Sequence, residues 1–317
     1  MELENQLRWS KSRSSIFSEC KRKYYLRYYQ HWGGWEKDAP EINRLAYRLG
    51  KMLSMPMLVG TAVHEVLARH FQGMRMGSFR ELRAEQAVEK MRRVWRNAKK
   101  ELWRSNPKRY PPLFEIYYKR VPPAQDLRDY ADSARRVIAN LKQMPVYLSL
   151  KALPPDGFLW IDPAHERFSE ETCFPVPPFE AISAPDLVFR QGGEIVIMDW
   201  KTGKESESDR LQMAAAALWA RHRIQPEGER MKAVLVYLKS SSSVDFAIDD
   251  EMMAGAEQTI IREMEAMSEY LKDASKNIPL AREEFPGHNN VNFCRHCEFQ
   301  EICLKNFPEE NVSEKKF

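Results

Sequence analysis

The sequence lacks the long apolar runs that membrane-spanning proteins carry. It has no stretch of eighteen apolar residues, so we expect no transmembrane span. Its first residues, Met-Glu-Leu-Glu-Asn-Gln, do not follow the basic and then apolar order of a signal peptide. A G-x-x-x-x-G-K-S/T motif is also missing, so any unwinding of nucleic acid would need a partner protein. These absences predict a cytoplasmic protein that makes no membrane contact.

Cysteine is scarce, with five residues in a chain of 317. In a cytoplasmic protein, cysteines favour free thiols or metal ligands over disulfides. Cys294, Cys297 and Cys303 lie within ten residues of one another, a spacing that suggests a metal or cluster site. Cys173 stands apart from them, and we expect it to be a buried free thiol.

The chain has little net charge, but the charge is unevenly distributed. The formal value is +4, while residues 75–120 hold fourteen Lys and Arg against five Asp and Glu, and residues 8–27 hold seven against one. Both segments also carry Trp and Tyr. Such basic, aromatic segments suit a nucleic-acid strand whose bases stack on the rings. Solvated helix faces would explain the same composition.

The expected order of elements is that of an α/β protein built on a mixed sheet flanked by helices. Thr61 is the expected cap of the second helix, which begins near residue 58. The stretch 75–150 is expected to be a helical insertion within a single domain spanning 1–317. Helices are expected over 10–31, 79–104, 125–144, 209–222 and 250–275, and strands over 185–201, 232–239 and 244–248.

The most informative stretch is a predicted β-hairpin over residues 185–201. Apolar strand-forming residues flank Gly192-Gly193, a pair typical of a two-residue turn. Counting outward from that turn places Asp186 opposite Asp199, and directly opposed side chains have Cβ atoms about 4.5–5.5 Å apart. A bulge beside the turn would break this register. The hairpin therefore predicts two carboxylates side by side.

Strand alternation puts Lys201 on the same face as Asp199 and Trp200 on the other face. Two aspartates held together repel each other, and burying them unpaired would be costly unless a cation joins them. Oxygen ligands suit Mg²⁺ or Mn²⁺. Lys201 would then orient or deprotonate a water, or stabilise developing charge on a phosphorane. The alternative is an exposed hairpin whose Lys201 and Asp199 form a weak surface ion pair.

Pro185-Asp186 followed by Asp199-Trp200-Lys201 resembles the signature of the PD-(D/E)XK nuclease superfamily. Within it, the chain is similar to RecB- and AddB-like exonuclease domains, including the CRISPR adaptation nucleases. The resemblance implies a restriction-endonuclease-like fold, in which helices flank a mixed central sheet. It also implies metal-assisted hydrolysis of phosphodiester bonds.

Two further motifs support the narrower similarity. Gly60-Thr-Ala-Val-His64 is similar to the histidine motif of these domains, and Gln212 to their glutamine motif. Gln212 would orient the catalytic lysine or the DNA strand. Glu65, about 100° around the helix from His64, is not expected to bind metal. By resemblance, the ligands of Mg²⁺ or Mn²⁺ would be His64, Asp186, Asp199 and a backbone carbonyl, that of Trp200 or, as the alternative, Met198.

The cysteine pattern resembles the iron–sulfur variety of these nucleases. By that resemblance, a 4Fe–4S cluster would be bound by Cys20, Cys294, Cys297 and Cys303. The cluster would staple residues 10–31 to residues 285–310, and closing so long a loop stabilises a fold. The alternative is a zinc site made from the three C-terminal cysteines and either His288 or His296.

One departure from the family concerns the tyrosine that usually follows the glutamine motif. Here alanine stands in its place, and Trp219, almost two turns further along, is the candidate to take part of its role. The expected activity is that of a DNA exonuclease preferring single-stranded ends, in repair, recombination or defence, with a helicase or integrase as a possible partner. The alternatives are a non-catalytic nucleic-acid-binding subunit, an end-trimming nuclease of CRISPR spacer acquisition, and an enzyme that cleaves RNA.

Overall fold

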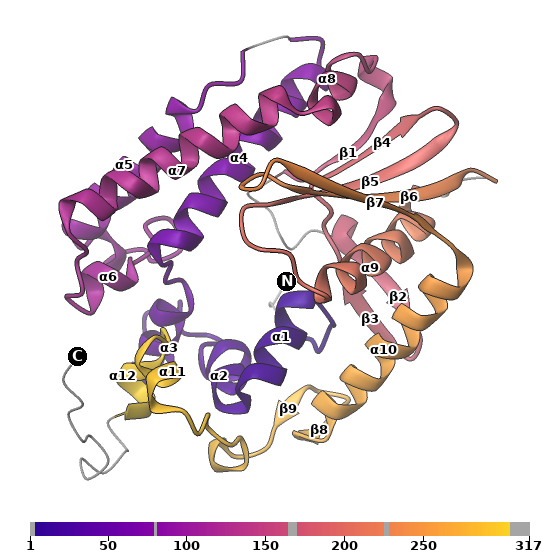
Figure 1. Ribbon diagram of the computed structural model, residues 1–317. Helices are drawn as coiled ribbons and strands as arrows, with labels where there is room; N and C mark the ends of the chain where they lie inside the picture. The colour runs from indigo at the N-terminus through magenta and orange to yellow at the C-terminus, as the bar shows by residue number, and fades with distance from the viewer. Residues whose placement is uncertain (1–3, 79–80, 164–169, 225–227, 305–317) are drawn as a thin grey trace.

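A five-stranded mixed sheet forms the centre of the protein, with the strand order β1-β4-β5-β6-β7 (Figure 1). This computed structural model describes residues 4–78, 81–163, 170–224 and 228–304. Strands β5 and β6 run parallel, and the other neighbours are antiparallel. The strands are β1 (Phe158–Ile161), β4 (Leu187–Gln191), β5 (Glu194–Lys201), β6 (Arg230–Tyr237) and β7 (Ser242–Ile248). The prediction of a mixed sheet flanked by helices is confirmed.

Helices cover both faces of this sheet and form two separate cores. Side chains of β5 alternate between them, with Met198 in the first core and Ile197 in the second. Asp199 and Lys201 share the parity of Ile197, so they emerge toward the second core at the carboxyl end of β5. The first core contains α4 (Met55–Arg75), α5 (Glu85–Lys99), α7 (Ala124–Gln143) and α8 (Pro145–Lys151), and the second contains α9 (Ser208–Arg223) and α10 (Asp250–Ser268).

The region expected to be a helical insertion is helical and packs on α4 (Figure 1). Besides α5, α7 and α8 it holds the short elements η2 (Leu102–Arg104) and α6 (Phe114–Tyr117), and η3 (Pro155–Gly157) follows it. On the opposite side of the sheet, β2 (Cys173–Val176) and β3 (Phe179–Ile182) form a small hairpin that packs with α9 and α10. Within the described residues, no helix is both long and apolar enough to cross a membrane.

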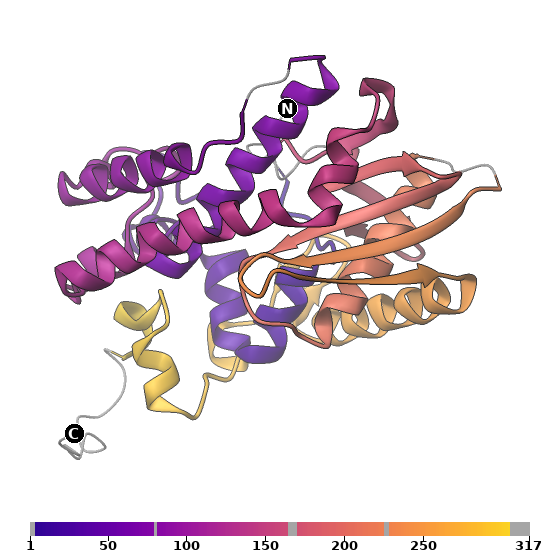
Figure 2. The same cartoon turned by 45° about the horizontal axis from the view of Figure 1, so that its top comes forward.

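The two ends of the chain lie together. Both views place α11 and α12 beside α2 and α3 (Figures 1 and 2). Leu26 and Leu49 from the N-terminal part share a small core with Phe299 and Ile302 from the C-terminal part. The elements concerned are α1 (Lys11–Glu19), α2 (Lys21–Tyr25), the π-helix η1 (Leu26–Gln30), α3 (Glu41–Gly50), α11 (Val291–Arg295) and α12 (Gln300–Cys303).

The single helix predicted over residues 10–31 is wrong, because the chain breaks at Cys20. This residue is extended, with φ −160° and ψ 114°. Its N–H donates to the carbonyl of Ile16 and closes α1, while its sulfur accepts the N–H of Lys23 and caps α2. The break lets the Cys20 thiol leave the helix surface toward the C-terminal segment.

Other helix boundaries also differ from the predictions. The helix predicted over 79–104 is α5, which runs from Glu85 to Lys99. The second helix begins at Met55, before the predicted residue 58, and its cap is Ser54 and not Thr61, because the Ser54 hydroxyl accepts the N–H of Met57. The helix predicted to end at residue 275 ends at Ser268. There the chain turns into the pair β8 (Leu271–Asp273) and β9 (Ile278–Pro279). Short-range hydrogen bonds and strand pairing therefore outweigh the apolar periodicity at these ends.

The glycine turn of the β4–β5 hairpin has the predicted register. Gln191 pairs with Glu194 and Leu187 with Met198, without a bulge. Gly192 and Gly193 have φ of +60° and +77°, the left-handed region that costs other residues about 1–2 kcal/mol. The turn therefore depends on glycine, and it sets where Asp186 and Asp199 fall.

Gly193→Ala is expected to lower the free energy of unfolding by about 1 kcal/mol. A Cβ at this position would meet no atom within 4 Å, so the loss would report backbone strain alone. The matched control is Gly255→Ala in the middle of α10, also free of neighbours within 4 Å, which should stabilise the protein by about 0.5–1 kcal/mol. Urea unfolding of both variants measures the difference. Equal effects of the two substitutions would contradict this account of the turn.

Candidate active site

The two predicted carboxylates lie at the open end of the β4–β5 hairpin. Asp186 directly precedes β4, and its Oδ2 accepts the backbone N–H of Trp200 at 2.7 Å. That hydrogen bond ties Asp186 to the strand that carries Asp199. Asp199 is 5% exposed, so the acidic pair lies largely inside the protein. The exposed-hairpin alternative therefore does not describe this site.

Lys201 joins the acidic pair from the same strand. Its Nζ lies 2.9 Å from Asp199 Oδ2 and 2.6 Å from Gln212 Oε1. Gln212 also donates through Nε2 to Asp199 Oδ1 at 2.9 Å. Helix α9 thus supplies one amide that contacts both the lysine and the carboxylate, which fixes their relative positions.

His64 reaches the site from α4, on the other side of the sheet. Its Nδ1 lies 2.9 Å from Asp186 Oδ1. The neighbouring Glu65 is 3% exposed and forms ion pairs with Arg69 on its own helix and with Lys90, which joins α4 to α5. Tertiary structure therefore brings His64, Asp186, Asp199, Lys201 and Gln212 together and turns Glu65 away from them.

Burial and the neighbouring Asp186 raise the pKa of Asp199 from its usual 3.8 to about 6. For Lys201, burial alone would lower the pKa, but the carboxylates of Asp199 and Asp209 outweigh it and the pKa is raised. Lys201 therefore remains an ammonium at neutral pH. The acidic pair by itself is a strained arrangement that an added positive charge would relieve.

Among the described residues, no group of three or more His, Cys, Asp or Glu side chains already stands as a set of metal ligands. At the acidic pair, the candidate atoms contact protein groups: His64 contacts Asp186, while Asp199 contacts Lys201 and Gln212. The donor chemistry nevertheless fits Mg²⁺ or Mn²⁺, since two carboxylates and an imidazole converge where negative charge is poorly compensated. The ligand role of the Trp200 carbonyl stays a prediction.

Cation binding is expected to strengthen as the pH rises through about 6, the pKa of Asp199. A cation binds the ionised carboxylate, so protons compete with the cation for Asp199 below this pH. Above this pH the carboxylate is ionised and the competition ends. Without a cation, the stability of the fold depends on pH in the opposite direction. The pKa of Asp199 is higher in the folded than in the unfolded protein, so its contribution to the free energy of unfolding falls as the pH rises from about 4 to about 6. The increase in melting temperature caused by a fixed Mg²⁺ concentration should be small near about pH 5 and reach a plateau above about pH 7.

The control for this measurement is Asp250→Asn, which removes a carboxylate whose side chain is 94% exposed on α10. It should leave the pH dependence unchanged, whereas Asp199→Asn should remove the Mg²⁺ response. A response to Mg²⁺ of the same size at all pH values would contradict the assignment to Asp199.

Two residues of the site were missed by sequence reasoning. Asp209 Oδ1 lies 3.3 Å from Lys201 Nζ, and Tyr237 donates its hydroxyl to Asp209 Oδ2 at 3.0 Å. The available signal was the i, i+3 spacing of Asp209 and Gln212, which puts both on one helix face. Tyr237 gave no such signal, because it reaches the site only through the pairing of β5 with β6.

The expected role of Trp219 in place of the family tyrosine is wrong. Its side chain is 1% exposed and its Nε1 donates to the carbonyl of Glu171 at 2.8 Å. The ring packs edge-on against Trp160, with centroids 5.0 Å apart. Trp219 is a core residue and is closed to substrate.

The structure buries some of the aromatic residues of the two basic segments. In the first, the aromatic residues Trp9, Phe17 and Tyr24 are buried in the second core, so they cannot stack on bases. In the second, Trp103 is buried as well. The positive charge remains at the surface, since α5 exposes Arg92, Arg93 and Arg96.

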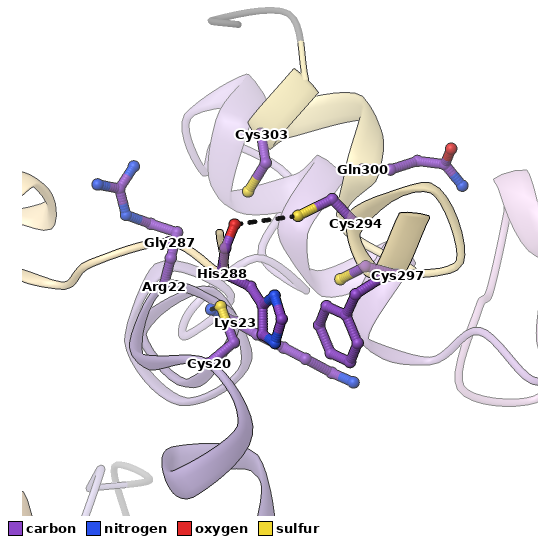
Figure 3. A pocket seen from close by; sticks show the side chains of 10 residues that line it. Cys20, Arg22, Lys23, Gly287, His288, Cys294, Cys297, Gln300 and Cys303 are labelled. Atoms are coloured by element: carbon purple, nitrogen blue, oxygen red, sulfur yellow. Dashed lines mark hydrogen bonds between the residues drawn. The ribbon is translucent and has the colours of Figure 1, made fainter. Parts of the chain in front are cut away.

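Four cysteine side chains meet between the N- and C-terminal helices. They line a cavity of about 200 Å³ together with Arg22, Lys23 and His288. Figure 3 shows the four sulfur atoms directed into this common space. The cysteines are Cys20, Cys294, Cys297 and Cys303. Cys173 is half-buried at the start of β2 and lies outside the cavity, so its predicted full burial is wrong.

Backbone N–H groups are directed at two of the four sulfurs. The backbone N–H groups of Lys23 and Phe299 donate to the sulfurs of Cys20 and Cys297, each at 3.4 Å. Hydrogen bonds to sulfur are typical of cluster-ligating thiolates. Burial raises the pKa of Cys297, as it does for Cys294 and Cys303. These three thiols are therefore neutral at physiological pH.

A zinc site that includes a histidine fits this cavity poorly. His288 lines the cavity, but its Nδ1 accepts the backbone N–H of Asn290 at 2.9 Å. A neutral ring then carries its hydrogen on Nε2 and has no electron pair left for a metal. The ring of His296 bonds through Nδ1 to the Asn292 carbonyl at 2.8 Å, and His296 is not among the described residues that line the cavity. Both histidine rings are therefore engaged elsewhere, and the described cysteines do not yet stand as a set of metal ligands.

A mixed sheet flanked by helices, with an acidic pair and a lysine on its central hairpin, defines a nuclease with a restriction-endonuclease-like fold. The family comparison agrees: the sequence model of the PD-(D/E)XK nuclease superfamily matches residues 8–304. The chain belongs to this superfamily. No curated protein matches it. Membership implies phosphodiester cleavage, for which these enzymes typically use divalent metals such as Mg²⁺.

Proposed function

We propose that this protein is a metal-dependent DNA nuclease that degrades DNA from its ends and prefers single strands. One observation carries the proposal: the Lys201 ammonium lies 2.9 Å from Asp199 Oδ2, beside the Asp186–His64 pair. A lysine so close to buried carboxylates at the end of a hairpin has the composition that phosphodiester hydrolysis needs.

A bound Mg²⁺ or Mn²⁺ would act as a Lewis acid and lower the pKa of a water ligand. Lys201 remains protonated, so it donates a hydrogen bond to the attacking water or to a phosphate oxygen. Gln212 holds Lys201 through Oε1 and Asp199 through Nε2, which keeps the lysine at a constant distance from the cation ligand. The residues that would hold the ion are His64, Asp186, Asp199 and Trp200 through its carbonyl.

The choice of DNA rests on surface charge and on family similarity. The exposed guanidinium groups of α5 suit a phosphate backbone. The preference for single-stranded ends comes from similarity to RecB-type exonuclease domains. Similarity also underlies the possible settings of repair, recombination and defence, including end trimming for an integrase.

We also propose that Cys20, Cys294, Cys297 and Cys303 bind a 4Fe–4S cluster with a structural role. Support comes from the four sulfurs around one cavity and from the two N–H donors to sulfur. The cluster would hold α2 against α11 and α12. Its site is separate from the acidic pair, so it would act on stability and not on the chemical step.

The test is cleavage of end-labelled single-stranded, double-stranded and circular single-stranded DNA with Mg²⁺, Mn²⁺ or Ca²⁺. The expected result is digestion of linear single strands with Mg²⁺ or Mn²⁺, survival of the circles, and no cleavage after chelation. Labels at either end give the polarity. Cleavage of the circles would show that the protein is an endonuclease and not an exonuclease. Faster cleavage of RNA than of DNA would show that RNA is the preferred substrate. If the protein cleaves none of these substrates, the proposal that it is a nuclease is wrong.

A non-catalytic nucleic-acid-binding subunit is the second candidate. The observation in its favour is the alanine that replaces the family tyrosine after Gln212. In that case wild type and Lys201→Ala would bind single-stranded DNA equally well and neither would cleave it. If the protein is a nuclease, wild type and Lys201→Ala should bind single-stranded DNA equally well, and only wild type should cleave it.

A further inference from the structure

A second carboxylate contacts Lys201 in addition to Asp199. Asp209 Oδ1 lies 3.3 Å from Lys201 Nζ, and Asp209 is 8% exposed. It stands in the first turn of α9, one turn before Gln212. The lysine therefore lies between a strand carboxylate and two side chains of one helix.

The position of Asp209 is set by two donors to its other oxygen. Oδ2 accepts the Tyr237 hydroxyl at 3.0 Å and the backbone N–H of Ser206 at 3.1 Å. Tyr237 is the last residue of β6 and pairs with Lys201 across the parallel strands. With Oδ2 engaged in this way, Oδ1 remains directed at the ammonium.

The lysine has as many acceptors as it has hydrogens. An ammonium carries three N–H donors. Its acceptors here are Asp199 Oδ2 at 2.9 Å, Gln212 Oε1 at 2.6 Å and Asp209 Oδ1 at 3.3 Å. In this arrangement no donor is left for a water or a phosphate oxygen.

We propose that Asp209, held by Tyr237, is a positioning residue that keeps Lys201 in place once Asp199 serves as a cation ligand. The inference rests on the proposed nuclease function. As a ligand, Asp199 would direct its electron pairs at the ion and would release one N–H of Lys201, which would then be free to donate to the substrate. Asp209 and Gln212 keep the other two. Without Asp209, the partly buried ammonium would have only a neutral amide as partner and would lose its fixed position.

A purely structural role is the competing explanation, because Asp209 also receives the Ser206 N–H at the start of α9. Such a role would affect folding stability but not the contacts of Lys201. The two explanations therefore differ in what happens to the lysine ammonium when a cation is added.

The experiment follows the ¹H–¹⁵N signal of the Lys201 ammonium, which hydrogen bonding protects from exchange with water. The signal is assigned by its absence in Lys201→Met. Ca²⁺ serves as the added cation, and kcat is measured separately with Mg²⁺. In wild type the signal should persist with and without Ca²⁺. In Asp209→Asn it should persist only without Ca²⁺, and kcat should fall by about 10–100-fold.

Tyr237→Phe should show the same pattern with smaller losses, and it carries the test if Asp209→Asn does not fold. The matched control is Asp250→Asn, which also removes an aspartate from the first turn of a helix and should change neither quantity. The inference is overturned if Asp209→Asn keeps both its kcat and its Ca²⁺-loaded ammonium signal. Failure of the proposed function is distinct: wild type itself would then be inert, and Ca²⁺ would leave the Lys201 signal of every variant unchanged.

Discussion

Lys201→Ala is expected to lower kcat for DNA cleavage by about 10³-fold while leaving DNA affinity nearly unchanged. The ammonium lies 2.9 Å from Asp199 Oδ2, and it stays charged because its pKa is raised by Asp199 and Asp209 despite burial. Removing it takes away a charged donor that acts where negative charge develops in the transition state. Lys201→Arg should not restore activity, because a planar guanidinium cannot match the three acceptors arranged around an ammonium.

Single-turnover cleavage of labelled DNA measures this loss, and a filter-binding assay measures affinity. The matched control is Lys232→Ala on the neighbouring strand β6, where the lysine pairs with Asp245 at 2.6 Å outside the site. That variant should cleave at the wild-type rate. Asp199→Ala should be as inactive as Lys201→Ala and should in addition lose the stabilisation by Mg²⁺. A Lys201→Ala protein that cleaves DNA normally would contradict the assigned site.

If the proposed iron–sulfur cluster is present, Cys20→Ser is expected to remove it and to destabilise the junction of the two chain ends by about 5 kcal/mol. The magnitude follows from the length of the loop between Cys20 and Cys294, because a crosslink limits the unfolded chain more as the loop it closes grows. Serine can still cap α2 by accepting the Lys23 N–H, so the helix start should survive the substitution. The loss would therefore report the missing ligand.

Iron and sulfide analysis, absorbance near about 400 nm and thermal unfolding of protein purified without oxygen measure this effect. Cys173→Ser is the control, since it removes a cysteine that does not line the cavity. It should keep the brown colour and the melting temperature of wild type. A colourless wild-type protein with one zinc ion per chain would contradict the cluster and point to a four-thiolate zinc site.

The hairpin shows how far sequence reasoning reaches. Gly192 and Gly193 adopt the positive φ values that their turn requires. Strand alternation from this turn then determines the face on which each side chain lies. Because both rules act within about twenty residues, the neighbourhood of Asp186, Asp199 and Lys201 could be predicted with no knowledge of the fold. The family motifs for His64 and Gln212 likewise pointed to residues that the structure brings to this site.

Residues far apart in the chain could not be placed in the same way. Trp219 and Trp9 have the aromatic character of substrate contacts, yet both are core residues, because the packing of helices on the sheet decides which side chains are covered. Cys20 was expected within a continuous helix, and the contact of Arg22 N–H with the Pro286 carbonyl shows that the segment is shaped by the C-terminal part. Composition alone carries no information about either outcome.

The sequence by itself determined the acidic hairpin, its register and its lysine, because turn chemistry and side-chain alternation are local properties. Only the tertiary structure decided which groups surround Lys201. Asp209 and Tyr237 reach it from a helix and a strand whose positions depend on the packing of α9 and β6 against β5. That packing arises from burial of apolar surface across the whole domain, a non-directional effect that no short segment encodes.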